Sequence, residues 1–203
     1  MRNTVVGIIL LLVAVVPRAV LAGPNILLRV SPAEAAWSSS SIEEKLIIRM
    51  SRDTAMSVTS VDGTDSALPA FPKDRYNVDS LIQWGLEIGG QYLMLVDVHH
   101  QRLERRKSFQ IPLFFHKYVT VGVISGELRL IDLNQGRLLV AQPFLKEQEA
   151  KRIFQSSDDD DANHPDLHLT APGKLVFFDQ MEDHLCDQLL EIIGFSERGN
   201  DGE

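Results

Sequence analysis

The stretch Leu81–Val98, LIQWGLEIGGQYLMLVDV, places a helix directly before a strand. Its first part has apolar residues at helical spacing, and Asn77 stands where a capping residue would begin the helix. Gly89 and Gly90 supply the left-handed residue that ends it. The run Gln91–Val98 is too continuously apolar for an exposed edge, so it is predicted to be a central strand.

A basic segment follows this strand. His99–Phe115 has four bases and one acid in its first half, and we interpret it as a solvated loop in preference to an anion site. His99 and His100 follow the strand with side chains on opposite faces, so they are not expected to act as a pair. The charged residues are Arg102, Glu104, Arg105, Arg106 and Lys107.

A β-hairpin is predicted next. Val119–Asp132 is typical of a long strand whose alternation slips, so a bend or bulge is expected at Gly122 or Gly126. Gly136 supplies the positive φ of the turn, and Arg137–Phe144 can return antiparallel. One face of the hairpin is expected to pack on the helices, and Arg129 is expected on the opposite, partner-facing side. The inward set is Leu128, Leu130, Leu138 and Val140.

Upstream of the opening stretch, two strands flank a helix. Asn25–Val30 and Met56–Val61 have strand patterns, and Ser40 with Glu43 forms a capping box that begins a helix between them. Asp62–Lys73 is rich in small residues and prolines and predicts a loop.

The carboxyl-terminal third is harder to assign. Leu145–Gln155 is interpreted as a short helix or a loop, and residues 156–173 as an acidic, mobile loop. Lys174–Phe178 is interpreted as a last edge strand or a lid on the core. The final helix is expected to begin at Asp179 and to end at Gly194.

Together these elements have the order β-α-β-α-β-β-β-α. That order predicts an α/β (α+β) fold, in which about three helices pack on a mixed sheet of about five strands. We expect one domain over residues 23–195 and a disordered tail over 196–203.

The amino terminus has the pattern of a secretory signal peptide. Arg2 precedes the apolar run Val5–Val16, and small residues lead to an expected cleavage after Ala22. The 12-residue core is short for a membrane-spanning helix, so no transmembrane segment is expected after cleavage; the alternative is an uncleaved anchor. Gly23 would then be the first residue, which leaves no cysteine there for lipid attachment. The expected location is the periplasm.

Charge and cysteine content limit the function. The chain has a net charge of −8, and loss of the two arginines in residues 1–22 makes it −10. Such a charge argues against nucleic acid as a partner. Cys186 is the only cysteine, so no intramolecular disulfide can form, and it is interpreted as a buried helix residue.

The run Leu81–Val98, followed after an insert by GELRLIDLNQGRLLVAQPF (Gly126–Phe144), resembles a domain of bacterial envelope proteins. The resemblance is to the amino-terminal part of TolB, the curli-secretion lipoprotein and the penicillin-binding-protein activator lipoproteins, and it covers about Asn25–Ile193. It implies a small α/β domain that works through protein contacts and has no catalytic residue. The lipid-bearing cysteine, the secretion pore and the propeller of those proteins have no counterpart in this sequence.

Few residues suggest chemistry. No glycine loop of phosphate-binding polarity and no Gly-x-Ser-x-Gly elbow occurs, so no enzyme is expected and no cofactor. The acidic loop carries carboxylates and imidazoles that could bind a metal, although a plain solvated loop is favoured. The metal candidates are Asp158, Asp160, His164, Asp166 and His168.

An aromatic cluster is the candidate for protein contact. Because Pro112 interrupts strand pairing, the cluster is expected at an edge or in a loop, where it forms a partner site or a self-packing lid. Its members are Phe114, Phe115, His116 and Tyr118. The sequence therefore favours an exported, non-enzymatic protein-interaction or assembly module of the bacterial cell envelope, monomeric or weakly homo-oligomeric. The alternative is a periplasmic ligand- or metal-binding protein.

Overall fold

The computed structural model describes residues 24–33, 41–53, 56–61, 68–111, 115–155 and 169–194. Its elements follow the predicted order and confirm an α+β fold. In chain order they are β1 (Asn25–Ser31), α1 (Ser41–Asp53), β2 (Ser57–Ser60), α2 (Val78–Ile88), β3 (Tyr92–Ile111), β4 (Phe115–Asp132), β5 (Arg137–Gln155) and α3 (Ala171–Ile192).

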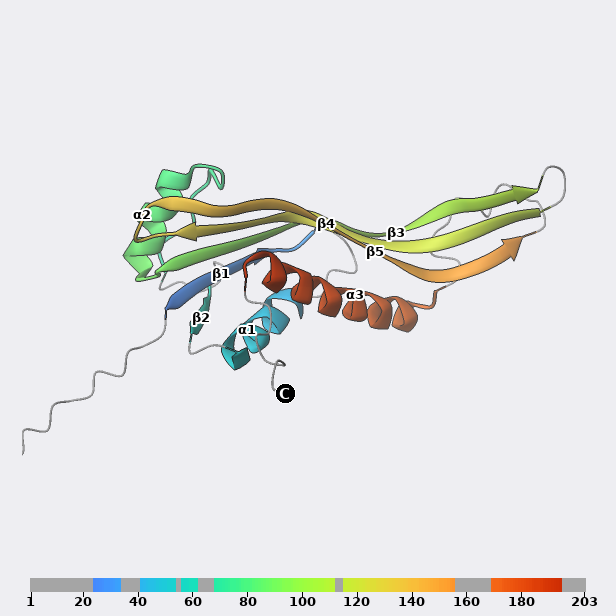
Figure 1. The fold of residues 1–203 in the computed structure, drawn as a ribbon, viewed down its shortest axis with the longest axis horizontal. Helices are drawn as coiled ribbons and strands as arrows, with labels where there is room; N and C mark the ends of the chain where they lie inside the picture. Colours follow the sequence, from blue (N-terminus) through green and yellow to red (C-terminus); the bar gives the residue numbers. More distant parts are fainter. Residues whose placement is uncertain are drawn as a thin grey trace, which may run out of the picture.

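The strands form one mixed sheet in the order β2-β1-β3-β4-β5 (Figure 1). β1 pairs parallel with both β2 and β3, whereas β3, β4 and β5 form an antiparallel meander. The parallel strands are joined through α1 and α2, as parallel pairing requires a crossover connection. The apolar run of β3 is thus a central strand, as predicted.

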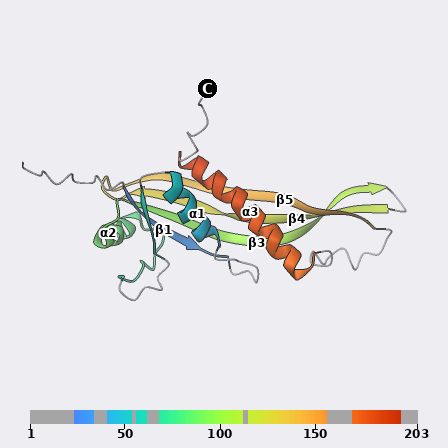
Figure 2. The same cartoon turned by 90° about the horizontal axis from the view of Figure 1, so that it is seen from below.

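Helices cover both faces of one half of the sheet. α1 and α3 pack on one face and α2 lies on the other, as the two views in Figures 1 and 2 show. Successive residues of β1 therefore enter different cores, with Leu28 toward α1 and α3 and Leu27 toward α2. The first core includes Ile42, Leu46, Met50, Met94, Ile124, Leu128, Leu130, Phe178, Met181 and Leu185, and the second includes Leu81, Trp84, Leu93, Leu95, Ile131 and Leu133.

Charged side chains clasp α1 to α3. Lys45 Nζ lies 2.7 Å from Asp179 Oδ1 and 3.3 Å from Asp183 Oδ1, while Arg49 Nη2 lies 3.1 Å from Asp183 Oδ1. Burial alone would lower the pKa of Lys45, but its hydrogen bonds to Asp179 and Asp183 outweigh that effect and raise it. We name these ion pairs of Lys45 and Arg49 with Asp179 and Asp183 the clasp, since they join the first helix to the last.

Cys186 is buried in the core between these helices, as predicted. Its side chain is fully inaccessible, and its Sγ lies 3.8 Å from the carbonyl oxygen of Ile42. Burial raises the pKa of this thiol to about 12. The thiol is therefore an inert core group, in agreement with the sequence.

The three meander strands are far longer than the others. They have 20, 18 and 19 residues, against the five or six that are usual. Their distal halves form a three-stranded ribbon, which α3 crosses on one face near Gly122 and which then continues beyond the described helices (Figure 1). The predictions of a loop after His99 and of a helix or loop at Leu145–Gln155 were therefore wrong.

A bulge explains the first of these errors. Val98 pairs with Gly126 but His100 pairs with Ser125, so His99 is an extra residue in β3. Because side chains alternate across a strand, one extra residue exchanges the two faces. Met94 and Val96 lie on the α1/α3 face before the bulge, and Leu103 lies on it afterwards. The shift of phase hides the continuous strand from a period-two search.

The expected irregularity at Gly122 or Gly126 was also misplaced. β4 runs unbroken, and the extra residues are in its neighbours, at His99 and Ser108 in β3 and at Leu139 and Ala150 in β5. Gly122 instead makes room for α3, because a Cβ there would lie 2.3 Å from Phe177 Cε1. The Leu139 bulge also places Leu138 opposite Ile131, on the α2 face, and not among the inward set.

The ends of the helices follow local signals only in part. The side chain of Asn77 accepts a hydrogen bond from Ser80 N, and Gly89 ends α2 with φ +89°, both as predicted. α3, however, begins at Ala171 with Thr170 as its cap. It therefore takes in residues 171–173, which were expected in the acidic loop, and the segment Lys174–Phe178, which was expected to be an edge strand or a lid on the core. Phe178, Met181, Leu185 and Leu189 then share one buried face, and this tertiary packing overrides the strand propensity of the segment.

Candidate functional site

The predicted metal candidates lie outside the described residues. Asp158, Asp160, His164, Asp166 and His168 all fall within residues 156–168, so the metal hypothesis stays a prediction. Within the ranges that the structure describes, no group of three or more His, Cys, Asp or Glu residues is placed to hold a metal ion.

The aromatic candidates lie at the far end of the ribbon. Phe114 is outside the described residues, whereas the backbone of Phe115, His116 and Tyr118 forms the start of β4. His116 pairs with Gln110 on one side and with Gln155 on the other, so these residues belong to the middle strand of the ribbon. The expected position at an edge or in a loop was therefore wrong for these three residues.

A lattice of charges covers one face of the ribbon, the face opposite α3. Arg106 bridges two acids, with Nη2 2.8 Å from Glu104 Oε2 on its own strand and 2.6 Å from Glu147 Oε1 on β5. Arg102 Nη2 lies 2.7 Å from Glu104 Oε1. We name Arg102, Glu104, Arg106 and Glu147, with the valines beneath them, the charged face.

Three valines of β4 form the floor of the charged face. Val119, Val121 and Val123 are at most 9% exposed, although none of the three described helices covers this face of the sheet here, since α3 packs on the opposite one. In the strand register, Arg102 and Arg106 pair with Val123 and Val119, and Glu147 also pairs with Val123. The aliphatic stems of these long side chains shield the valines and leave their charged groups in solvent.

The electrostatics of the charged face agree with this pairing. The hydrogen bonds of Arg106 and Arg102 lower the pKa of Glu104, and the hydrogen bond of Arg106 lowers the pKa of Glu147. The pKa of Arg106 is raised by Glu147 and Glu104 in turn. Glu104, Arg106 and Glu147 therefore hold one another in their charged forms.

The outer edge of the ribbon, formed by β5, has features that disfavour the addition of another strand. β5 is the outer strand, and an open edge of 19 residues could pair with another chain. Pro143 has no N–H to donate, and the bulges at Leu139 and Ala150 interrupt the regular edge. Protein contact at the ribbon is therefore favoured through its face.

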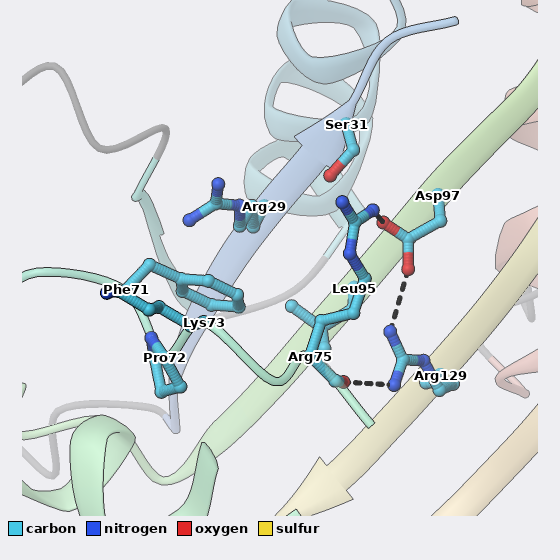
Figure 3. Close-up of a pocket in the computed structure, with 9 residues that line it drawn as sticks. All are labelled: Arg29, Ser31, Phe71, Pro72, Lys73, Arg75, Leu95, Asp97 and Arg129. Atoms are coloured by element: carbon cyan, nitrogen blue, oxygen red, sulfur yellow. Dashed lines mark hydrogen bonds and ion pairs between the residues drawn. The ribbon is translucent and has the colours of Figure 1, made fainter. Parts of the chain in front are cut away.

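A second site lies in the body, where segment 68–76 passes over the sheet on the α2 side (Figure 3). It is a cavity of about 220 Å³ between that segment and strands β1, β3 and β4. We name it the arginine pocket. Its lining is Arg29, Ser31, Phe71, Pro72, Lys73, Arg75, Leu95, Asp97 and Arg129.

A buried ion pair forms one wall of the arginine pocket. Arg129 Nη2 lies 2.7 Å from Asp97 Oδ2, and both residues are about 4% exposed. Arg75 Nη1 approaches the other oxygen of Asp97 at 3.2 Å, and Arg129 also donates to the backbone oxygen of Arg75. Arg129 is thus buried, and the prediction that it faces outward was wrong.

Aromatic rings hold the covering segment in place. The guanidinium of Arg29 lies 3.7 Å from the ring centre of Phe71, and that of Arg129 lies 4.8 Å from the ring centre of Tyr76. Phe71 also packs edge-on against Trp84, whose Nε1 donates to Pro69 O at 3.0 Å. These contacts fix segment 68–76 over the arginines of the sheet.

Sequence reasoning missed the arginine pocket, although one signal was present. Asp97 is an acid inside the apolar run that was identified as a central strand. A buried carboxylate needs a cation or hydrogen-bond donors, because its isolated burial costs several kcal/mol. The signal predicts a partner but not its identity, since Arg129 is 32 positions away in the sequence.

No protein-family model matches the sequence, and no curated protein matches it. Solved structures give weak likenesses. The PelC dodecamer from Paraburkholderia phytofirmans has a TM-score of 0.42 at 11% identity, over 85% of this chain and 88% of that one. Rare lipoprotein B from Shewanella oneidensis has 0.36 at 15%, over 84% and 93%. Lipoprotein GNA1162 from Neisseria meningitidis has 0.37 at 10%, over 80% and 97%.

Two of these neighbours are bacterial lipoproteins by name, but their TM-scores are all below 0.5, so no function is transferred from them. A specific relation to TolB or to curli secretion is not confirmed. Among the helices that the structure describes, none is long and apolar enough to cross a membrane.

Proposed function

We propose that this chain is an exported, non-enzymatic module of the bacterial cell envelope that binds a partner protein through its ribbon. The main observation in support is the ribbon formed by the distal halves of β3, β4 and β5, which α3 crosses on one face near Gly122 and which then extends beyond the described helices (Figure 1). Leu103 and Ala150 at the base of the ribbon still join the α1/α3 core, and the strands beyond them add surface. A projecting ribbon with one patterned face is suited to contact with another protein.

The charged face supplies the residues of the ribbon that would bind the partner protein. It presents arginines on β3 and a glutamate on β5 above a valine floor, and Leu145 beside them is 57% exposed. Interfaces of this kind gain specificity and association rate from complementary charges, and affinity from apolar residues at their centre. The partner is therefore expected to carry charges of both signs around an apolar contact.

The proposed cellular location rests on the sequence of the amino terminus. The signal-peptide pattern of residues 1–22 supports export to the periplasm with cleavage after Ala22. Association with the outer membrane is part of the same proposal. Intact-mass analysis of the chain from envelope fractions should then show Gly23 as the first residue. A mass that retains Met1 would contradict cleavage.

Site-specific photocrosslinking in intact bacterial cells tests the binding surface. A photoreactive residue at Leu145, on the charged face, is compared with one at Ile48 on α1, which is similarly exposed at 48%. A discrete adduct with one envelope protein is expected from Leu145 and not from Ile48. It should disappear when Arg102 and Arg106 are both changed to Gln. Equal adducts from both positions, or an adduct that survives the double change, would contradict the proposal.

A further inference from the structure

We propose that the arginine pocket binds an oxyanion, the carboxylate or phosphate group of a small molecule. This inference is independent of the ribbon and of the proposed function. It starts from the charge of the lining, which contains Lys73, Arg75 and Arg129 but only one carboxylate, that of Asp97, and this carboxylate contacts Arg75 and Arg129. The cationic side chains of the pocket exceed what this one acid can balance.

The pocket lies where ligands bind in open α/β sheets. Ser31 ends β1 and pairs with Asp97 in the parallel strand β3, so the pocket sits at the carboxyl end of β1. The next element after β1 is α1, on the opposite face, whereas β3 continues to its hairpin with β4. A position beside the carboxyl end of a parallel strand is a common ligand site in such sheets.

The cations of the pocket divide into a fixed one and two accessible ones. Arg129 is held by Asp97 and by the backbone of Arg75, so its position and charge are already set. The side chain of Arg75 is 53% exposed, and Lys73 on the same segment is also exposed. Arg75 and Lys73 can therefore bind an oxyanion while the buried ion pair of Arg129 and Asp97 stays intact. A guanidinium and an ammonium together suit carboxylate and phosphate oxygens.

The size of the pocket limits what enters it. Its volume of about 220 Å³ is below the ~300 to 1,000 Å³ of sites for drug-sized ligands, so it accommodates a small group. A neighbouring cavity of about 550 Å³ shares Ser31, Arg75 and Asp97 with it and continues past His100. The remainder of a larger molecule would extend in that direction.

Titration of the isotope-labelled, purified chain followed by NMR tests the proposal. Sodium phosphate and sodium succinate are the two probes, each at ionic strength held constant with sodium chloride. Saturable shifts are expected for backbone amides of residues 29–31, 73–76 and 95–97. Tighter binding of phosphate would identify the source of the anion as a phosphate compound, and tighter binding of succinate would identify a carboxylate; either supports the site.

A matched pair of variants locates the binding. Lys73→Gln with Arg75→Gln should weaken the binding of the better probe at least about tenfold, because two charge-assisted contacts are lost. Both side chains are exposed, so folding should persist. The control, Arg137→Gln with Lys146→Gln on β5, removes the same charge and should leave the affinity unchanged. Absence of saturable shifts, or equal affinity in the two double variants, would overturn the proposal.

Discussion

The same chemistry, an arginine beside a carboxylate, occurs in the body and in the ribbon with different surroundings. Arg129 and Asp97 have side chains that are 5% and 6% exposed, whereas Arg106 and Glu147 are 43% and 39% exposed. Both pairs lie on the same face of the sheet, and only the first is covered, by segment 68–76. Burial beneath a covering segment, and not the distance within the pair, therefore decides which ion pair the fold depends on.

Thiol reactivity should show the largest difference between the two regions. Cys186 is buried in the body with its pKa raised to about 12, whereas a cysteine placed at exposed Leu145 would have an ordinary thiol. At pH 8 the Leu145→Cys variant, in a Cys186→Ala background, should react with a thiol reagent at least about a thousandfold faster than native Cys186. Stopped-flow labelling measures both rates. Similar rates in the folded state would mean that the body core opens freely.

Loss of the buried arginine should have the next largest effect. Arg129→Ala leaves Asp97 buried with only the partly exposed Arg75, and it should cost about 3 to 5 kcal/mol of unfolding free energy in urea titrations. The double variant Asp97→Leu with Arg129→Met removes both charges and should recover much of the loss. If Arg129→Ala lowered the unfolding free energy no more than Arg106→Ala does, the buried pair would not be the more important of the two for stability.

A smaller effect is expected where the ribbon meets α3. Gly122→Ala would place a Cβ 2.3 Å from Phe177 Cε1 and 2.5 Å from Met181 Sδ, so the helix must shift. The cost should be about 1 to 3 kcal/mol in the same titrations. Ser125→Ala, on the other face of β4, serves as the control and should change stability little. Equal stability of the two variants would show that α3 is loosely seated.

The charged face should contribute least to stability. Arg106→Gln breaks the contacts to Glu104 and Glu147, which are solvated, so no measurable change in the urea midpoint is expected. Partner crosslinking through Leu145 should nevertheless decrease. A clear loss of stability would mean that the lattice is a structural element and that the two ion pairs are equivalent after all.

Local signals predicted much of the fold. The caps at Asn77 and Gly89, the turn at Gly136 and the central strand after Gln91 are all present, because each depends on neighbours in the sequence. The order of the elements follows from them. The ribbon was missed because one extra residue, His99, exchanges the faces of β3, and a search for alternation treats that change as the end of a strand.

The candidate site was less predictable than the fold. Arg129 alternates with Leu128 and Leu130 as an outward residue should, and its burial depends on a segment more than 50 positions earlier in the chain. A single strand cannot indicate that its second face is covered. For the charged face, the sequence provided the charges but not their positions above Val119, Val121 and Val123.

The clasp between α1 and α3 has a consequence for how the chain reaches its native state. Lys45 and Asp179 are 134 positions apart, while the meander that separates them can form from contacts between successive strands. Contacts between distant residues form late, since closing a long loop costs entropy. During synthesis, α1 must wait for the last helix before its core is closed. A nascent chain that stops before residue 171 would therefore have strands but no sealed core, which leaves the protein open to chaperones and proteases until its final segment is made.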